Sequence, residues 1–326
     1  TTKVPMGYVQ EGYKVLVLNP SVATTLSMGP YMQKAYNIAP SVYTGETSIG
    51  TGTKLTYATY GKAAAMDTSL LTGYDVVICD ECHDVTATTI LGIGHVLTKA
   101  ESCGVKLVIL ATATPPGCST TPHPNITEVE LGSSGEVQFY GKRLELAHYL
   151  KGRHLIFCAS KLVCDTLASL LRQHGITAVA YYRGEPVSKI PDAGDVVVVA
   201  TDALMTGYTG NFDSVTDCNL AVVQDLTVDL NPTFSVAVRT VQADAVTRIQ
   251  RRGRTGRGKP GIYRYVDKGE ACSGIVSEAA VVEAFDQAYA WLRAAPAETK
   301  AMLAAYSRQP GLPVINADLD MWEQFF

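Results

Sequence analysis

The sequence predicts an α/β protein with two parallel sheets, followed by a helical segment. Three observations lead to this prediction. Short apolar runs recur along the chain and are continuous rather than alternating, which is typical of strands buried on both faces. Helical stretches lie between these runs, as they do where helices cover a parallel sheet. After Val266 the strand pattern stops, and two helical stretches follow.

The expected strands are apolar runs, each followed by a polar or glycine-rich turn. They are Lys14–Leu18, Asp75–Cys79, Lys106–Leu110, His154–Cys158, Ala178–Tyr182 and Asp195–Ala200. Val163–Gln173 has the pattern of a helix, and Gly175 closes it. The alternating stretch from Asn219 to Val241, with Asn231-Pro232 in its middle, predicts a long β-hairpin. The two predicted sheets have a similar pattern of apolar strands and intervening helices, which indicates a structural duplication.

The chain has 326 residues, and domains usually hold roughly 100–200 residues, so two domains and part of a third are expected. Pro115–Pro124 is rich in Pro, Gly, Ser and Thr and is the expected linker. Val276–Ala290 and Ala297–Ser307 have helical patterns. The predicted domains are residues 1–116, 117–270 with a hairpin at about 219–241, and 271–326.

Composition restricts the classes of function. The formal net charge is −4, so a nucleic acid would be held by specific donors in a local groove rather than by bulk positive charge. The eight cysteines are scattered along the chain, and no Cys/His cluster has the spacing of a zinc site, which predicts reduced, mostly buried thiols of an intracellular protein and no structural metal. No run is long enough to span a bilayer, and no signal peptide opens the chain.

The strongest motif is Asp80-Glu81-Cys82-His83, which directly follows the strand Val76–Cys79. Ligands of open parallel sheets bind outside the carboxyl ends of the strands. There Asp80 can hold Mg²⁺, directly or through water, and Glu81 can orient and deprotonate an attacking water. A lone Asp-Glu pair is more often a solvated acidic loop, but the buried strand before it favours the catalytic interpretation.

The second motif is the basic segment Gln250–Gly258, which reads QRRGRTGRG. A basic patch usually contacts a phosphate backbone directly. Here glycines permit tight turns that hold Arg254 and Arg257 in fixed positions. Fixed guanidinium groups suit the charge that develops on a transferring γ-phosphoryl group.

Together these motifs resemble motifs II and VI of superfamily 2 helicases. The sequence around them is similar to that of the non-structural protein 3 helicase of hepatitis C-like viruses. The resemblance covers essentially the whole chain. It includes the segments VLVLNPSV (15–22), LATATPPG (110–117), YYRG (181–184), TDALMTG (201–207) and PGLP (310–313). It implies two RecA-like domains of the P-loop NTPase type plus part of a third, mainly helical domain, with ATP or another NTP and Mg²⁺ bound between the first two.

The resemblance assigns roles residue by residue. His83 and Gln250 match a pair that faces across the cleft between the domains and couples nucleotide state to closure. Arg254 and Arg257 match arginines that reach the γ-phosphate, with Arg257 the finger. Further matches are Thr112 and Thr114 in a motif that links hydrolysis to strand movement, and Gly207, which faces the nucleotide.

The family's P-loop is the one departure. Residues 1–5, TTKVP, resemble those just after the P-loop lysine, and Thr1 matches a hydroxyl that binds Mg²⁺. The lysine and its glycines do not appear in the sequence, and Lys3 lies on the wrong side of the hydroxyl. One alternative is therefore a catalytically incomplete fragment that only binds nucleic acid. A sequence like GSGK before Thr1 would restore the enzyme.

A helicase holds a strand through its backbone, without reading its bases. The resemblance places a first set of contacts in domain one, a second in domain two, and three bracketing residues at the strand's ends. These are Ser21, Val22, Gly45, Thr59 and Lys62; Ser160, Lys161, Arg183 and Thr201; and Val222, Glu283 and Trp291. Trp291 matches an aromatic that stacks on a terminal base, although a lone Trp is more often a core residue. Glu283 matches an acidic residue that repels the strand, and a solvated helix charge is as good a reading.

The resulting hypothesis is an NTP-dependent RNA helicase and translocase of a viral replication complex, with the 3′ to 5′ polarity of the family. A motor that prefers DNA is a further alternative, because only contacts to 2′-hydroxyls separate the two strands. Expected partners are single-stranded RNA, with DNA also bound in vitro, and other viral replication proteins. The family adds an upstream serine protease domain in cis, a viral cofactor protein, and a peripheral location at endoplasmic-reticulum-derived membranes of the host cytoplasm.

Overall fold

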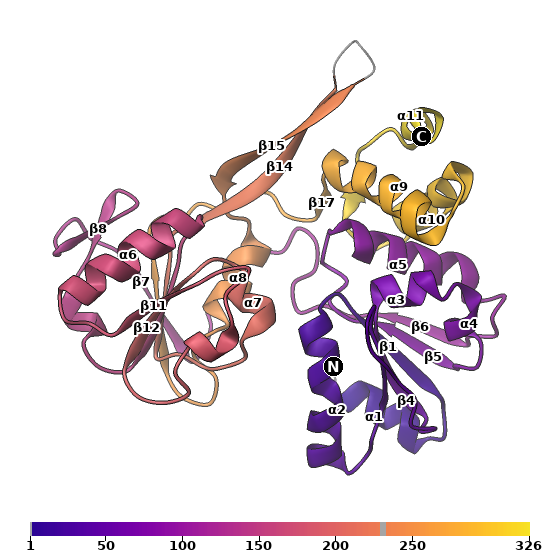
Figure 1. Cartoon of the computed structure of the whole chain (residues 1–326), viewed down its shortest axis with the longest axis horizontal. Helices are drawn as coiled ribbons and strands as arrows, with labels where there is room; N and C mark the ends of the chain where they lie inside the picture. The colour runs from indigo at the N-terminus through magenta and orange to yellow at the C-terminus, as the bar shows by residue number, and fades with distance from the viewer. Residues whose placement is uncertain (1, 229–232) are drawn as a thin grey trace. The chain divides into compact units, whose positions relative to one another are not determined.

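The computed structural model describes residues 2–228 and 233–326, which form two compact units. Unit 1 is Thr1–Pro116, Asp225–Val236 and Gly274–Phe326. Unit 2 is Gly117–Gln224 and Ala237–Ser273. Figure 1 shows the elements of both units. Thr1 and the predicted turn at Asn231-Pro232 lie outside the described residues.

The sheet of unit 1 has six strands in the order β3-β2-β4-β1-β5-β6, all parallel except β3. Its strands are β1 (Val15–Asn19), β2 (Ser41–Tyr43), β3 (Ser48–Ile49), β4 (Leu55–Thr59), β5 (Val76–Cys79) and β6 (Leu107–Leu110). Its helices are α1 (Lys3–Gln10), α2 (Val22–Tyr36), α3 (Tyr60–Ala65), α4 (Thr68–Leu71) and α5 (Ala87–Lys99).

Two apolar cores enclose this sheet, one on each face. Along β1, Val15 and Val17 point into the core that α1 and α2 complete. The alternate residues Leu16 and Leu18 point into the core that α3 and α5 complete. Because side chains alternate along a strand, only a continuous apolar run can fill both cores. The prediction of strands buried on both faces is therefore confirmed for β1 and β5. It is wrong for β6, which lies at the edge of the sheet and is only partly buried, with Leu107 exposed.

The last part of the chain is helical and shares the second of these cores. Its elements are β17 (Ile275–Val276), α9 (Glu278–Leu292), α10 (Pro296–Arg308), β18 (Val314–Ile315) and α11 (Leu319–Phe325). Phe285, Leu303 and Trp322 pack in the same cluster as Ile90 and Ile93 of α5. Figure 1 shows α9 and α10 beside α5. The helices fall close to their predicted ranges, and the boundaries of a third domain stay a prediction.

Unit 2 repeats the plan of unit 1, with the strand order β11-β12-β10-β13-β16-β7. Its strands are β7 (Ile126–Glu130), β8 (Val137–Phe139), β9 (Lys142–Leu144), β10 (Arg153–Phe157), β11 (Ala178–Tyr181), β12 (Val196–Ala200), β13 (Ser214–Asp217) and β16 (Gly261–Tyr265). Its helices are η1 (Leu146–Tyr149), α6 (Lys161–Gln173), η2 (Val187–Lys189), α7 (Leu204–Gly207) and α8 (Ala245–Arg252). In sequence order, β10, β11, β12 and β13 take the places of β1, β2, β4 and β5, as a structural duplication requires.

The predicted hairpin is present as a separate two-stranded sheet of β14 (Leu220–Val228) and β15 (Phe234–Gln242). Five of the eight cysteines are buried, in line with the prediction, and all eight are free thiols. Among the described residues, no helix is long and apolar enough to cross a membrane. The same residues contain no group of three or more His, Cys, Asp or Glu side chains placed to hold a metal ion.

Candidate active site and strand-binding surface

The Asp80–Asp84 loop follows β5 at the carboxyl edge of the unit 1 sheet, and backbone hydrogen bonds fix it there. The Asp80 amide donates to the Leu18 carbonyl at 2.9 Å, and the Cys82 amide donates to the Ala111 carbonyl at 3.0 Å. The buried Tyr60 hydroxyl donates to the Asp80 carbonyl at 2.5 Å. Both neighbouring strands, β1 and β6, thus hold the loop, as preorganised catalytic groups require.

Asp80 and Glu81 have different surroundings. Asp80 is buried, and its Oδ1 accepts the Glu81 amide at 3.0 Å. Glu81 is partly exposed and has a left-handed backbone, with a φ of 55°. Burial, followed by the charge of Asp80, raises the pKa of Glu81. A left-handed backbone and a raised pKa at one carboxyl are features that often mark functional sites, and the roles of Glu81 as base and Asp80 as metal ligand stay predictions.

A chain of side-chain contacts joins the ends of β5 and β6. His83 Nδ1 lies 2.7 Å from Thr112 Oγ1, and Thr112 Oγ1 accepts the Thr114 amide at 3.0 Å. On its other side, His83 Nε2 lies 3.5 Å from Glu81 Oε2. The predicted coupling threonines are therefore bonded to the predicted catalytic loop within unit 1. The predicted approach of His83 to Gln250 stays a prediction.

The arginines of the Gln250–Gly258 segment separate into different structural classes. Arg251 is buried and forms a bidentate pair with Asp202 at 2.8 and 2.9 Å. Its Nη1 also donates to the fully buried Asp217 at 2.8 Å. Arg252 is also buried, and its Nη1 donates to the Thr121 carbonyl at 2.6 Å. Sequence reasoning missed these two as anchors of unit 2. Their position in the last turn of α8, which packs on β13, was the available signal.

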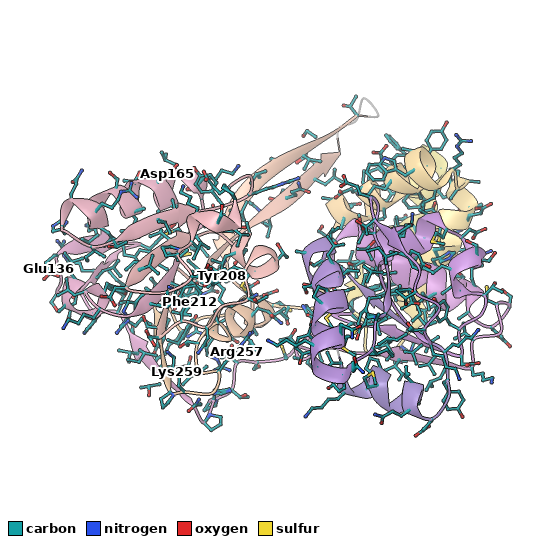
Figure 2. The ribbon with its side chains drawn as sticks, turned by 60° about the horizontal axis from the view of Figure 1, so that its bottom comes forward. Glu136, Asp165, Tyr208, Phe212, Arg257 and Lys259 are labelled. Atoms are coloured by element: carbon teal, nitrogen blue, oxygen red, sulfur yellow. The ribbon has the colours of Figure 1, made fainter. Side chains whose placement is uncertain are left out.

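Arg254 and Arg257, the two predicted phosphate-facing arginines, also differ. Arg254 is buried and donates to the carbonyls of Tyr208 and Met205 at 2.7 and 2.6 Å, on either side of Gly207. Burial, followed by the charge of Arg257, lowers the pKa of Arg254 to about 10. Arg257 is exposed, and its Nε donates to the Gly253 carbonyl at 2.9 Å. Figure 2 shows Arg257 and Lys259 at one end of unit 2, with Asp165 and Glu136 elsewhere on its surface.

Gly207 ends α7, and a Cβ there would overlap the Tyr181 hydroxyl oxygen, so a side chain at this position requires Tyr181 to move. The two carbonyl bonds from Arg254 fix the backbone on both sides of this glycine. Gly207 is partly exposed. Its predicted role of facing the nucleotide stays a prediction.

A pocket of about 510 Å³ in unit 1 brings together most of the strand-binding residues predicted for that unit. Its lining includes Val22, Gly45, Thr59, Lys62 and Trp291. Val22 begins α2, Gly45 follows β2 and Thr59 ends β4, so these residues meet at the carboxyl edge of the sheet, and α9 brings Trp291 to the same pocket.

Ser21 lies directly before Val22 and caps α2, with its Oγ accepting the Thr24 amide at 3.2 Å. Thr59 caps α3 in the same way, accepting the Lys62 amide at 3.3 Å. Both hydroxyls thus stand at helix N-termini. Backbone N–H groups and the helix dipole favour anions at such ends, whatever the attached base.

α9 supplies the aromatic wall of this pocket. Trp291 is 80% exposed, so it lies outside the core, contrary to the usual place of a lone tryptophan. Glu283 is exposed two turns earlier on the same helix. Gln287, midway between them, lines the pocket as well, and sequence reasoning missed it. Its spacing of four residues from both neighbours places all three on one helix face and was the signal that could have found it.

Unit 2 presents the matching residues at the equivalent edge of its own sheet. Ser160 follows β10 and caps α6, with its Oγ accepting the Val163 amide at 3.3 Å. Lys161 Nζ donates to the Arg183 carbonyl at 3.2 Å and lies over the Tyr182 ring. Thr201 follows β12, as Thr59 forms the end of β4.

The remaining predicted contact in the hairpin is Val222, which is 47% exposed on β14. Exposure of an apolar side chain on a strand leaves it available for a partner. The assignment of Val222, and of the two sets of strand contacts, stays a prediction.

Comparisons with known proteins agree with these features. Residues 9–126 match the family described as "Flavivirus DEAD domain". The whole chain is 58% identical to the genome polyprotein of hepatitis C virus genotype 2k (isolate VAT96) and 59% identical to that of genotype 3b (isolate Tr-Kj). In both cases the chain spans 11% of the relative's length. The chain therefore belongs to the hepatitis C virus-like non-structural protein 3 helicases, the helicase segment of a viral polyprotein.

Proposed function

We propose that the chain carries the motor of an NTP-dependent RNA helicase that moves 3′ to 5′ along single-stranded RNA. The observation that carries the proposal is the pairing of a buried Asp80 with a Glu81 of raised pKa, on a loop bonded to both neighbouring strands. The direction of movement and the preference for RNA are supported by family membership alone.

The donor set of the Asp80–Asp84 loop fits Mg²⁺ with a nucleoside triphosphate. Carboxylate oxygens are the ligands that Mg²⁺ prefers, and Asp80 presents one carboxylate beside a second. Bound there, the metal would neutralise charge on the phosphates. Thr1, the second expected ligand, lies outside the described residues.

The residues of this chain then have distinct tasks in hydrolysis. Glu81 orients the attacking water and takes its proton, and the raised pKa makes it a stronger base than an ordinary carboxylate. Arg257, with its exposed guanidinium, stabilises the charge on the transferring γ-phosphoryl group. The contacts from Glu81 through His83 to Thr112 pass a change at the catalytic loop to the end of β6.

The pocket beside Trp291 is the proposed strand-binding site of unit 1. The Ser160–Arg183 surface is the proposed strand-binding site of unit 2. Hydroxyls at helix N-termini and a lysine contact phosphates, while the exposed indole stacks on a base of any kind. Two equivalent grips on two similar units are the minimum for stepwise movement. The motor thus needs no sequence-specific contact.

The remaining proposals rest on kinship with hepatitis C virus polyproteins. They are an upstream serine protease domain in the same polypeptide, a viral cofactor protein, other replication proteins as partners, and a peripheral place at endoplasmic-reticulum-derived membranes. DNA strands are proposed as an additional ligand in vitro.

The experiment is ATP hydrolysis by the intact viral protein, with and without poly-U RNA, for the parental sequence and Glu81→Gln. We expect stimulation by RNA in the parent, and in Glu81→Gln a loss of turnover of about 100-fold or more, with RNA and nucleotide affinity kept. Normal turnover in Glu81→Gln would overturn the assignment of the base. RNA binding without any hydrolysis by the parent would leave a binding module, and a tighter hold on poly-dT than on poly-U would favour a DNA motor.

A further inference from the structure

Gln287 makes two hydrogen bonds, one to a helix distant in sequence and one within its own helix. Thr88 Oγ1 on α5 donates to Gln287 Oε1 at 3.2 Å. Gln287 Nε2 donates to Glu283 Oε1 at 3.0 Å, one turn earlier on α9. Thr88 and Gln287 both line the pocket that holds Trp291. All of these residues belong to unit 1.

The chemistry of the partners determines the direction of both bonds. A carboxylate can only accept hydrogen bonds, so the Gln287 amide must turn its NH₂ group toward Glu283. Its carbonyl oxygen then faces Thr88, whose hydroxyl has to donate. The Glu283 carboxylate therefore selects the orientation of the amide, and the Thr88 hydroxyl, which can donate or accept, donates to the carbonyl end and tethers it to α5.

Thr88 is also bonded, through its own helix turn, to the proposed catalytic loop. It lies in the first turn of α5, which begins three residues after Asp84. The Asp84 amide donates to the Glu81 carbonyl at 3.0 Å, and Asp84 Oδ1 accepts the Thr86 amide at 2.8 Å. A displacement of the loop therefore moves the start of α5 and the Thr88 hydroxyl with it.

We propose that Gln287 is a positioning residue that couples the Asp80–Asp84 loop to the strand pocket by holding the Glu283 carboxylate in a place that Thr88 selects. When Thr88 shifts with the loop, the amide turns and Glu283 is released from its fixed position. A carboxylate within about 8 Å of a phosphate chain repels it under physiological salt, so its position alters the hold on the strand. This inference rests on the proposed function.

The route is physically specific because it consists of hydrogen bonds between identified atoms, joined by the backbone from Thr86 to Thr88 at the start of α5. It needs no contact between the two units. It also explains why a glutamine, with one donor end and one acceptor end, stands between a hydroxyl and a carboxylate. A hydrocarbon side chain of similar length would line the pocket equally well but would transmit nothing between Thr88 and Glu283.

The test is the coupling between nucleotide and strand affinity in the intact viral protein. The Kd of a labelled oligo-U RNA is measured by fluorescence anisotropy, with and without a non-hydrolysable ATP analogue and Mg²⁺. The ratio of the two Kd values is the coupling factor, and it is reciprocal between the ligands. Thr88→Val and Gln287→Met keep size and remove the hydrogen bonds. Gln173→Met, an exposed position of unit 2, is the matched control.

We expect Thr88→Val and Gln287→Met each to reduce the coupling factor by about 3- to 10-fold. Both residues line the strand pocket, so the readout is the ratio of the two Kd values and not the nucleotide-free Kd alone. The double variant should lose no more than either single one, because both substitutions break the same path. Gln173→Met should keep the parental factor. A merely structural role of Gln287 would shift both Kd values together and leave their ratio unchanged.

The proposed function and the coupling role of Gln287 fail in different ways. A parental protein whose RNA affinity does not respond to the nucleotide overturns both together. A parental protein with coupling that Gln287→Met retains overturns the role of Gln287 alone. Additive losses in the double variant also overturn that role, because they show two separate routes.

Discussion

Replacing Arg251 with alanine is expected to unfold unit 2 rather than to remove a phosphate contact. Arg251 is 2% exposed and donates to Asp202, to Asp217 and to the Leu220 carbonyl, at 2.8 to 2.9 Å. Asp217 has no exposed surface and also accepts the Tyr263 hydroxyl at 2.6 Å. Arg251→Ala removes the cation and leaves a carboxylate inside the protein.

The magnitude follows from what the buried carboxylate can then do. Breaking a buried ion pair by removing one partner costs about 3–5 kcal/mol, because the remaining charge is uncompensated. Such a loss is comparable to the whole stability of many domains, which is about 5–15 kcal/mol.

The assay is urea unfolding at pH 7, followed by circular dichroism and by hydrogen exchange of amides in β10, β12 and β13. Arg257→Ala is the matched control, because Arg257 is exposed and makes one bond to a carbonyl. It should change the free energy of unfolding by less than about 1 kcal/mol. Equal and small losses in both variants would refute the division of the motif into buried anchors and an exposed arginine.

Three further predictions concern the site and its surroundings. Burial and Asp80 raise the pKa of Glu81, so the acid limb of the pH–kcat profile for ATP hydrolysis should lie at a higher pH than that of an ordinary carboxylate. An acid limb near pH 4 in RNA-stimulated hydrolysis would contradict this. Burial lowers the pKa of His154, which bonds Ser214 at 2.6 Å and the Lys151 carbonyl at 2.7 Å. The neutral His154 ring therefore contributes its full stability above the unfolded pKa of about 6.5, and this contribution is lost as pH falls toward the folded pKa. Urea midpoints should decline below about pH 6.5 in the parent and decline less in His154→Gln. Trp291→Ala should spare RNA-stimulated hydrolysis and weaken unwinding of a 3′-tailed duplex, and unwinding at the parental rate would remove Trp291 from the strand-binding surface.

Periodicity was sufficient for the parallel sheets, because a strand between two helix layers must be apolar on both faces. Leu16 and Val17 in β1 enter opposite cores, and the sequence shows that demand as an unbroken apolar run. The position of Asp80 and Glu81 followed from the same rule, since the residue after a buried strand lies at the sheet's edge. The family resemblance then supplied roles that spacing could not.

The contacts that sequence could not predict are those that depend on facing elements far apart in the chain. Thr88 and Gln287 are 199 residues apart, and nothing local marks them as partners. The basic segment Gln250–Gly258 likewise contains arginines of identical chemistry that differ in burial and in hydrogen-bond partners. Arg251 faces the sheet from the last turn of α8, whereas Arg257 lies on the loop beyond it. Only the packing of that helix decides which arginine becomes an anchor.

The duplicated plan of the two units explains how one fold can supply two different halves of the proposed motor. In both, a serine caps the helix after the central strand, Ser21 in unit 1 and Ser160 in unit 2, and such a cap offers hydroxyl and N–H donors to any phosphate. The grip on the strand can therefore be the same twice. What differs lies outside this shared framework: the loop after β5 carries the acids, whereas the segment after α8 carries the arginines. Because loops change without disturbing the sheet, a duplicated fold can keep the proposed strand contacts in both copies and divide the proposed chemistry between them.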